Sequence, residues 1–170
     1  MAGLTFLRLS SGQLIEVKGT QTSAGAGDAG KIVALDSGGK LDSTLLPTGV
    51  GAETETIVAS EGLSAGDLVN IYNNSGTRTC RKADASNGRR AHGFVLAVVE
   101  SAANATVYTA GTNNGLTIAV TNAGLPVYLS TSGAVSTTAA STPGHLSQEV
   151  GICVGANKVA FTPHRPVTLA

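Results

Sequence analysis

Apolar and polar residues alternate in short stretches along most of the chain, and turn-forming residues separate these stretches. After residue 53, the alternation and the β-branched residues predict a series of short strands. The expected ranges are 55–60, 67–72, 78–83, 92–99, 105–109, 116–120, 127–130, 133–137, 150–154 and 158–162. The turn segments 73–76 and 113–115 contain Asn and Gly, which accept positive φ. This spacing predicts an all-β body, either a small antiparallel β-sandwich or a β-barrel.

Several of these strands carry one apolar face. The alternation places three sets of side chains on buried faces: Leu116, Ile118 and Val120; Val150, Ile152 and Val154; and Val159 and Phe161. Residues 93–99 are apolar throughout, which predicts a central strand covered on both sides. In an assembling protein, a neighbouring subunit can supply the second cover.

The N-terminal part of the chain follows a different pattern and predicts an extended arm over residues 1–52, with the body at 53–170. Ranges 4–9 and 13–18 predict a hairpin around Ser10-Ser11-Gly12, and 20–30 is a linker of small residues. Residues 31–36 then predict a strand. Leu41, Leu45 and Leu46 stand at near-helical spacing before Pro47, with Asp42 or Ser43 as the cap of one short turn.

Composition narrows the classes of protein. The 170 residues are 42% hydrophobic and only 13% charged, with 22 Gly and no Trp, so Val, Ile, Leu and Ala must build the core. The net charge of zero argues against a nucleic-acid partner. No apolar run reaches the length of a membrane span or a signal peptide, so we expect no membrane partner. Cys80 and Cys153 predict two small buried thiols in a reducing cytoplasm.

Charge is divided unevenly along the chain. Residues 1–66 hold seven acidic against four basic residues, and residues 67–170 hold four acidic against seven basic. Five of the bases gather in one stretch: Arg78, Arg81, Lys82, Arg89 and Arg90. These bases predict either two solvated loops or a basic patch that meets an acidic neighbour, such as the surface of a binding partner or another subunit's arm.

Candidate chemistry is scarce. His92, His145 and His164 lack the spacing of metal ligands, and no nucleophile elbow occurs. Residues 25–30 match GxGxxG but lack the flanking strand and helix of a dinucleotide site, so they are interpreted as linker. The sequence therefore predicts no catalytic residue, no metal, no cofactor and no enzyme activity.

Two parts of the chain resemble known phage proteins. Residues 30–47 (GKIVALDSGGKLDSTLLP) resemble a segment of phage head-fibre, capsid-decoration and tail-fibre proteins. The stretches 63–72 (LSAGDLVNIY), 81–86 (RKADAS) and 91–96 (AHGFVL) resemble bacteriophage capsid decoration (cement) proteins, as do 126–130 and 144–151. The resemblance implies a structural virion protein on the outer capsid surface, made in the host bacterial cytoplasm. It also implies a homo-oligomer, with a trimer favoured over a dimer.

A decoration protein of this kind would bind the major capsid protein and stabilise the assembled shell. We expect the arm to make that contact by β-augmentation through ranges 4–9 and 32–35. Its apolar contacts to the capsid or to a sister subunit would be Leu4, Phe6, Leu9, Ile32, Val33, Leu35, Leu41, Leu45 and Leu46. The alternative is a head- or tail-fibre module for host attachment, although the scarcity of aromatic residues disfavours a sugar-stacking surface. A glycan hydrolase is the weakest option, since it needs two carboxylates in a cleft.

Overall fold

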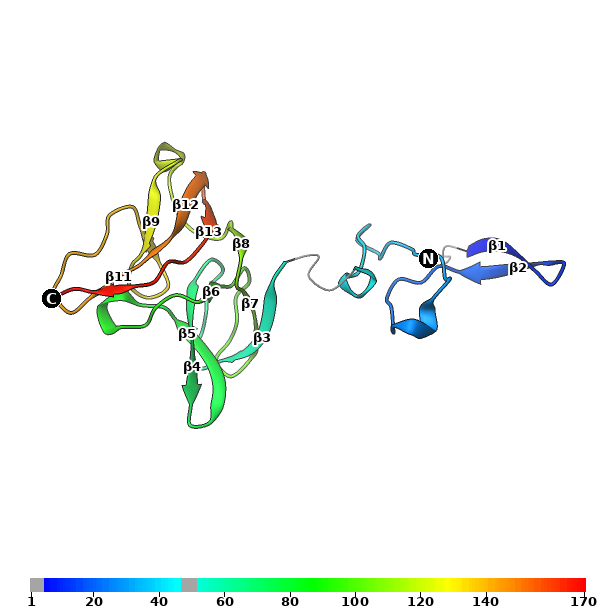
Figure 1. Ribbon diagram of the computed structural model, residues 1–170, viewed down its shortest axis with the longest axis horizontal. Helices are drawn as coiled ribbons and strands as arrows, with labels where there is room; N and C mark the ends of the chain where they lie inside the picture. The colour runs from blue at the N-terminus through cyan, green and yellow to red at the C-terminus, as the bar shows by residue number, and fades with distance from the viewer. Residues whose placement is uncertain (1–4, 47–51) are drawn as a thin grey trace. The chain divides into compact units, whose positions relative to one another are not determined.

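The computed structural model describes residues 5–46 and 52–170, which form short strands joined by turns (Figure 1). The chain divides into two compact units, Met1–Gly51 and Ala52–Ala170, called here the N-terminal unit and the body. The described residues contain strands and short 3-10 turns but no α-helix, which confirms the predicted all-β class.

The N-terminal unit begins with an antiparallel hairpin of β1 (Thr5–Ser10) and β2 (Gln13–Lys18). Ser11 and Gly12 have φ of 50° and 80°, the left-handed pair that matches the twist of a two-residue hairpin. The hairpin is confirmed with nearly the predicted bounds. Two single 3-10 turns follow, η1 (Ala26–Asp28) and η2 (Ser43–Leu45).

The strand predicted at residues 31–36 is wrong. This segment makes one isolated parallel bridge, between Val33 and Thr20. The Thr20 N–H donates to the Ile32 carbonyl, and the Ala34 N–H donates to the Thr20 carbonyl. A strand needs a row of backbone partners, and Thr20 alone offers only one such position.

The first sheet of the body closes on itself as a five-stranded barrel in the order β3-β5-β4-β6-β7. Its strands are β3 (Thr54–Ala59), β4 (Leu68–Asn74), β5 (Thr77–Lys82), β6 (Gly93–Phe94) and β7 (Asn104–Tyr108). The β3–β5 pair is parallel, whereas the other pairs are antiparallel. The expected antiparallel arrangement therefore holds except at the seam that closes the barrel.

A second five-stranded sheet packs beside the barrel in the order β10-β9-β12-β13-β8 (Figure 1). Its strands are β8 (Gly111–Asn113), β9 (Pro126–Leu129), β10 (Val135–Ser136), β12 (Glu149–Gly155) and β13 (Lys158–Phe161). A small pair of β11 (Leu146–Ser147) and β14 (Val167–Thr168) completes the body, with 3-10 turns η3 (Ala85–Asn87) and η4 (Val120–Asn122). The strand predicted at 116–120 is wrong: Leu116 and Ile118 are buried without strand pairing, and Val120 begins η4.

The body has two hydrophobic cores because neighbouring residues on one strand point to opposite faces. Val69 and Val95 pack inside the barrel, with Ile57, Cys80 and Val107. Their chain neighbours Leu68 and Phe94 instead pack in a core between barrel and second sheet. That core also contains Val127, Leu129, Val150, Val159 and Phe161. Phe94 links the two layers, with its ring centroid 5.3 Å from both Tyr108 and Phe161.

The apolar run at 93–99 is a strand only over Gly93–Phe94, so the prediction of a long central strand is wrong in extent. The apolar residues here are covered by this chain itself, since Phe94 faces the second sheet and Val95, directly after the strand, faces the barrel interior. Beyond Phe94 the chain leaves the sheet, and Val98 is exposed.

The predicted buried face of residues 150–154 is also wrong after its first residue. Val150 is buried, but Ile152 and Val154 are exposed and Cys153 is buried in their place. The register of β12 against β9 shifts between Glu149 and Gly151, which marks a β-bulge. One extra residue reverses which side chains face the core.

Candidate functional site

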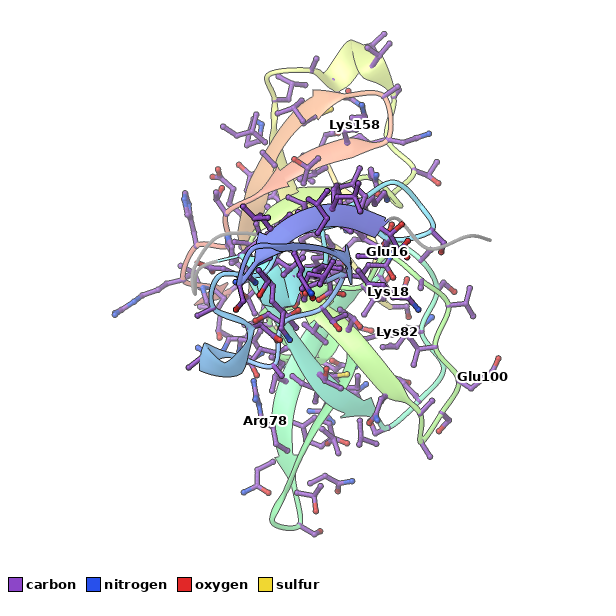
Figure 2. The ribbon with its side chains drawn as sticks, turned by 90° about the vertical axis from the view of Figure 1, so that its right-hand side faces the viewer. Glu16, Lys18, Arg78, Lys82, Glu100 and Lys158 are labelled. Atoms are coloured by element: carbon purple, nitrogen blue, oxygen red, sulfur yellow. The ribbon has the colours of Figure 1, made fainter. Side chains whose placement is uncertain are left out.

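One face of the β1–β2 hairpin is formed by exposed leucines. Directly opposed residues in an antiparallel pair share a face, and Leu9 pairs with Leu14, with Leu7 two residues before Leu9. The exposed fractions of Leu7, Leu9 and Leu14 are 73%, 68% and 70%. We call these three residues the leucine face. Glu16 and Lys18 lie further along β2 on the same face (Figure 2).

The opposite face of the hairpin is partly covered by the unit itself. Phe6 is half-buried beside Gly19 and Ala34. A Cβ added to Gly19 would lie 2.6 Å from the Ala34 Cβ and 3.1 Å from the Phe6 ring, so the two segments approach closely only because residue 19 is Gly. Ala34 is the sole buried hydrophobic residue among those described in the N-terminal unit.

The other predicted contact residues of the arm divide into three groups. Ile32, Val33, Leu35 and Leu41 are exposed, with their side chains open to a partner. Leu45 and Leu46 are half-buried within the unit. Leu4 lies outside the described residues. The sequence pattern missed Leu7 and Leu14, although the confirmed hairpin register places both on the same face as Leu9.

Carboxylates hold the rest of the N-terminal unit in shape. The Thr44 N–H and hydroxyl donate to Asp42 at the start of η2, as expected for a cap, and Asp36 accepts from the N–H groups of Gly38 and Lys40. Asp28 accepts from the Ala24 N–H and pairs with Lys31. The Lys31 hydrogen bond lowers the pKa of Asp28, and the Thr44 hydroxyl lowers the pKa of Asp42.

These features leave the N-terminal unit with apolar side chains outside and almost none inside. An isolated two-stranded hairpin is at best marginally stable in water, and local polar caps contribute only modestly. A unit of this kind gains order when its apolar surface is covered. The N-terminal unit is therefore the best candidate for an attachment surface.

Charge balance changes when it is counted by structural unit. The N-terminal unit has four acidic and four basic residues, and the body has seven of each. The uneven division counted at residue 66 cuts through the body rather than between units. An attraction between an acidic arm and a basic body therefore loses its basis.

The five bases predicted as one patch are separated by the fold. Arg78 and Lys82 stand near opposite ends of β5 (Figure 2). Arg78 forms a 2.7 Å ion pair with Glu55, and Lys82 forms a 3.1 Å ion pair with Asp67. The Arg81 guanidinium lies 4.0 Å above the ring of Tyr72. These three side chains have partners within the body.

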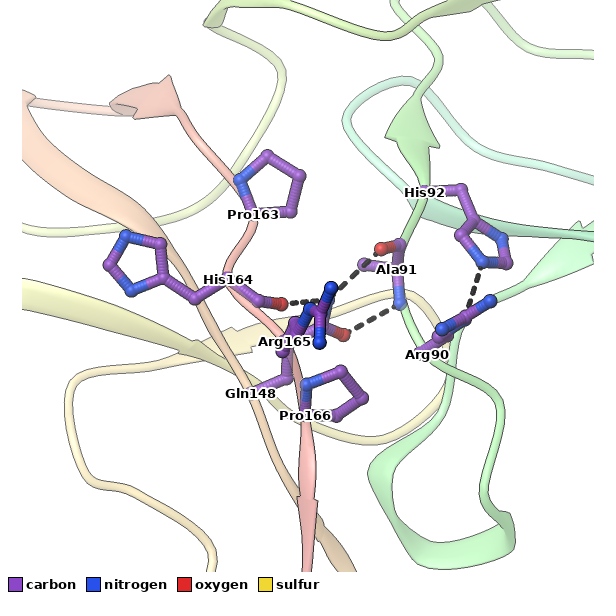
Figure 3. A pocket seen from close by; sticks show the side chains of 8 residues that line it. All are labelled: Arg90, Ala91, His92, Gln148, Pro163, His164, Arg165 and Pro166. Atoms are coloured by element: carbon purple, nitrogen blue, oxygen red, sulfur yellow. Dashed lines mark hydrogen bonds between the residues drawn. The ribbon is translucent and has the colours of Figure 1, made fainter.

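Arg90 instead joins a cluster that the sequence pattern missed. An open hollow of about 210 Å³ is lined by Arg90 and His92 from one segment and by His164 and Arg165 from the C-terminal segment (Figure 3). Arg89 lies next to it in the chain, and its backbone pairs with Asp84. The run Pro-His-Arg-Pro at 163–166 concentrates charge between two prolines, which is the signal that could have identified the second segment.

His92 sits at the edge of this hollow and completes the barrel. The Ile71 N–H lies 2.9 Å from His92 Nδ1, and Arg90 Nε lies 2.7 Å from Nε2. A neutral imidazole has one acceptor nitrogen, so only one of these contacts is a hydrogen bond at a time. Burial, and secondly the charge of Arg90, lower the pKa of the His92 imidazole. His92 therefore has a structural role at the end of β4.

The described residues add little reactive chemistry. Residues 5–46 and 52–170 hold no group of three or more His, Cys, Asp or Glu side chains placed to bind a metal ion. Cys80 and Cys153 are both buried and free, which confirms that part of the prediction which concerns the burial of the two thiols, and burial raises the pKa of the Cys80 thiol. Within the same residues, no helix has the length and apolar character needed to cross a membrane.

Comparison with known proteins gave no match, whether with protein-family models, with curated proteins or with solved structures.

Proposed function

We propose that this protein is a decoration subunit of a bacteriophage particle, which binds the outer surface of the assembled capsid and stabilises it. The proposal rests mainly on the exposed apolar surface of the N-terminal unit. Its leucine face is exposed, and among the described hydrophobic residues of this unit only Ala34 is buried. The resemblance of residues 30–47 to phage head-fibre, capsid-decoration and tail-fibre proteins, and of the body segments to capsid decoration proteins, suggests the partner, the major capsid protein.

The two units would have different roles in attachment. The body buries two cores of its own, so it can remain folded while the N-terminal unit contacts the shell. The apolar side chains of the N-terminal unit would be covered by capsid subunits, and binding only to the assembled shell stabilises that state by linkage. Many identical subunits would occupy one shell, associated as homo-oligomers with a trimer favoured over a dimer. Their contacts act together, so a contact that is weak for one subunit becomes firm attachment.

The test is co-sedimentation of the full chain with expanded shells, comparing wild type with a triple variant, Leu7→Thr, Leu9→Thr and Leu14→Thr. Threonine keeps the β propensity of the hairpin but removes apolar area. Burying one leucine is worth about 1.5 kcal/mol or more, so we expect at least a roughly tenfold loss of affinity.

The matched control carries Val120→Thr, Ile152→Thr and Val154→Thr, which change three exposed apolar residues of the body. We expect this variant to bind shells like the wild type. Equal occupancy for wild type and the leucine-face variant would reject the assignment. Immunogold labelling of particles is the second check, since a signal confined to tails would favour the fibre alternative.

A further inference from the structure

The hollow beside His92 brings together parts of the chain that are far apart in sequence. Residues 90–92 form one wall, and residues 163–166 form the other, with Gln148 between them (Figure 3). Two of the lining side chains, Arg90 and Arg165, carry a fixed positive charge, and two more are the imidazoles of His92 and His164.

The backbone beneath these side chains is firmly held. Gln148 is buried, and its side chain accepts from the Ala91 N–H and donates to the carbonyls of Ala91 and His164. The His164 N–H donates to the Glu149 carbonyl. Pro163 and Pro166 fix φ on either side of His164 and Arg165. The backbone that carries the basic side chains is therefore held in place, which lowers the cost of ordering this part of the site on binding.

The positive charge of the hollow is not neutralised within the part of the chain that the structure describes. Over residues 5–46 and 52–170, neither Arg90 nor Arg165 has a carboxylate within ion-pair distance. Glu149 is the acidic residue beside the hollow, and its Oε2 lies 3.8 Å from Nδ1 of His164. Two exposed guanidinium groups thus remain open to an anion from outside.

The charge of the whole protein limits what that anion can be. A nucleic acid presents a long row of phosphates and requires an extended basic track, whereas this body has seven acidic and seven basic residues. A single confined cluster with two arginines instead fits one carboxylate, which the guanidinium fork binds through two parallel hydrogen bonds.

We propose that this hollow is a docking site for a carboxylate side chain from an acidic segment of a protein partner. Arg90 and Arg165 bind the carboxylate, and Gln148 acts as a positioning residue. The site lies on the body and is separate from the leucine face, so it goes beyond the attachment proposed above. Its test needs no phage particle, and its failure leaves that attachment untouched.

The test measures binding of a hexaglutamate peptide to the full chain at low salt by NMR titration. The double variant Arg90→Gln with Arg165→Gln should bind about tenfold more weakly than wild type. The control variant, Arg78→Gln with Lys158→Gln, has the same net charge but leaves the hollow intact. It should bind within about twofold of wild type.

Two further probes distinguish the ligand. Inorganic phosphate and a single-stranded DNA oligonucleotide are titrated in parallel, and binding of the DNA in preference to the peptide would overturn the assignment to a protein carboxylate. Equal weakening in both variants would show an unspecific charge effect and would also overturn it, as would a wild type that does not bind the peptide at low salt. Amide spectra of the variants check that each remains folded.

Discussion

At the scale of single residues, side-chain amides and imidazoles complete hydrogen bonding where the short strands of the body end. Gln148 bonds the backbone of Ala91 and His164, and His92 stands beside the Ile71 N–H where β4 loses its neighbour β6. A buried N–H or carbonyl without a partner costs free energy, so these side chains are as necessary as a ladder bond.

The first prediction concerns Gln148. The substitution Gln148→Met keeps a similar volume but leaves the Ala91 N–H and two carbonyls without partners. We expect the free energy of unfolding to fall by about 2–4 kcal/mol, measured by urea denaturation. Gln13→Met on the exposed hairpin is the control and should change stability by less than about 0.5 kcal/mol. An unaltered urea midpoint for Gln148→Met would contradict the role assigned to this side chain.

The second prediction concerns pH. The pKa of His92 is lowered in the folded state, so the unfolded chain binds more protons between the two pKa values. The contribution of His92 is fully present above the unfolded pKa of about 6.5 and is lost as pH falls through the folded value. Its slope is at most about 1.4 kcal/mol per pH unit.

The His92→Asn variant isolates this effect. The Asn carboxamide oxygen can take the place of Nδ1 as acceptor for Ile71 but does not titrate in this range. Unfolding measured from pH 7.5 downward should show a shallower loss of stability for the variant than for wild type, with the difference confined to pH below about 6.5. Parallel curves for the two proteins would rule out His92 as the titrating group.

At the scale of elements, the fold depends on where alternation is interrupted. The hairpin and most body strands could be predicted, because period-two apolar patterns and Asn-Gly or Ser-Gly turns are local signals. The bulge in β12 could not, because it depends on the register against β9 and not on residues 150–154 alone. Range 93–99 failed differently, because its apolar residues serve two cores from a segment that leaves the sheet after Phe94.

The same distinction applies to the candidate site. The N-terminal unit could be predicted as a contact surface because its apolar residues lie in a segment too rich in small residues to bury them. The hollow was missed because Arg90 and Arg165 meet only through the pairing of distant segments around Gln148.

The third prediction tests the close approach of β12 to β13 at Gly151. Gly151 has φ of 147°, and an added Cβ would lie 1.9 Å from the Ala160 carbonyl oxygen on β13. Gly151→Ala should therefore lower the free energy of unfolding by about 1–3 kcal/mol. Gly155→Ala in the same strand is the control, since its nearest atom would be 4.0 Å away, and a larger loss for the control would refute the argument. Thermal denaturation followed by circular dichroism compares the two.

At the scale of the whole molecule, stability and attachment are assigned to different units. The body holds both hydrophobic cores, whereas the N-terminal unit depends on a hairpin and carboxylate caps. Few buried apolar contacts and exposed backbone hydrogen bonds favour local opening. We therefore expect the hydrogen-exchange protection of amides in the N-terminal unit to be several orders of magnitude lower than that of amides in the body.

The fourth prediction follows from that division. A chain that begins at Ala52 should unfold cooperatively within about 3 °C of the full chain, because it keeps both cores. In the full chain, the amides of β1 and β2 should exchange much faster than those of β4 and β12. Loss of cooperative unfolding in the shortened chain would show that the body requires the N-terminal unit, contrary to this account.

The most direct measurement is a density map, by electron cryo-microscopy, of expanded shells built from the major capsid protein of the same genome and incubated with the full chain. The account predicts ordered copies on the outside of the shell, with Leu7, Leu9 and Leu14 at the capsid contact and the barrel held away from it. Bare shells, or copies seated on the barrel with the hairpin turned to solvent, would contradict it.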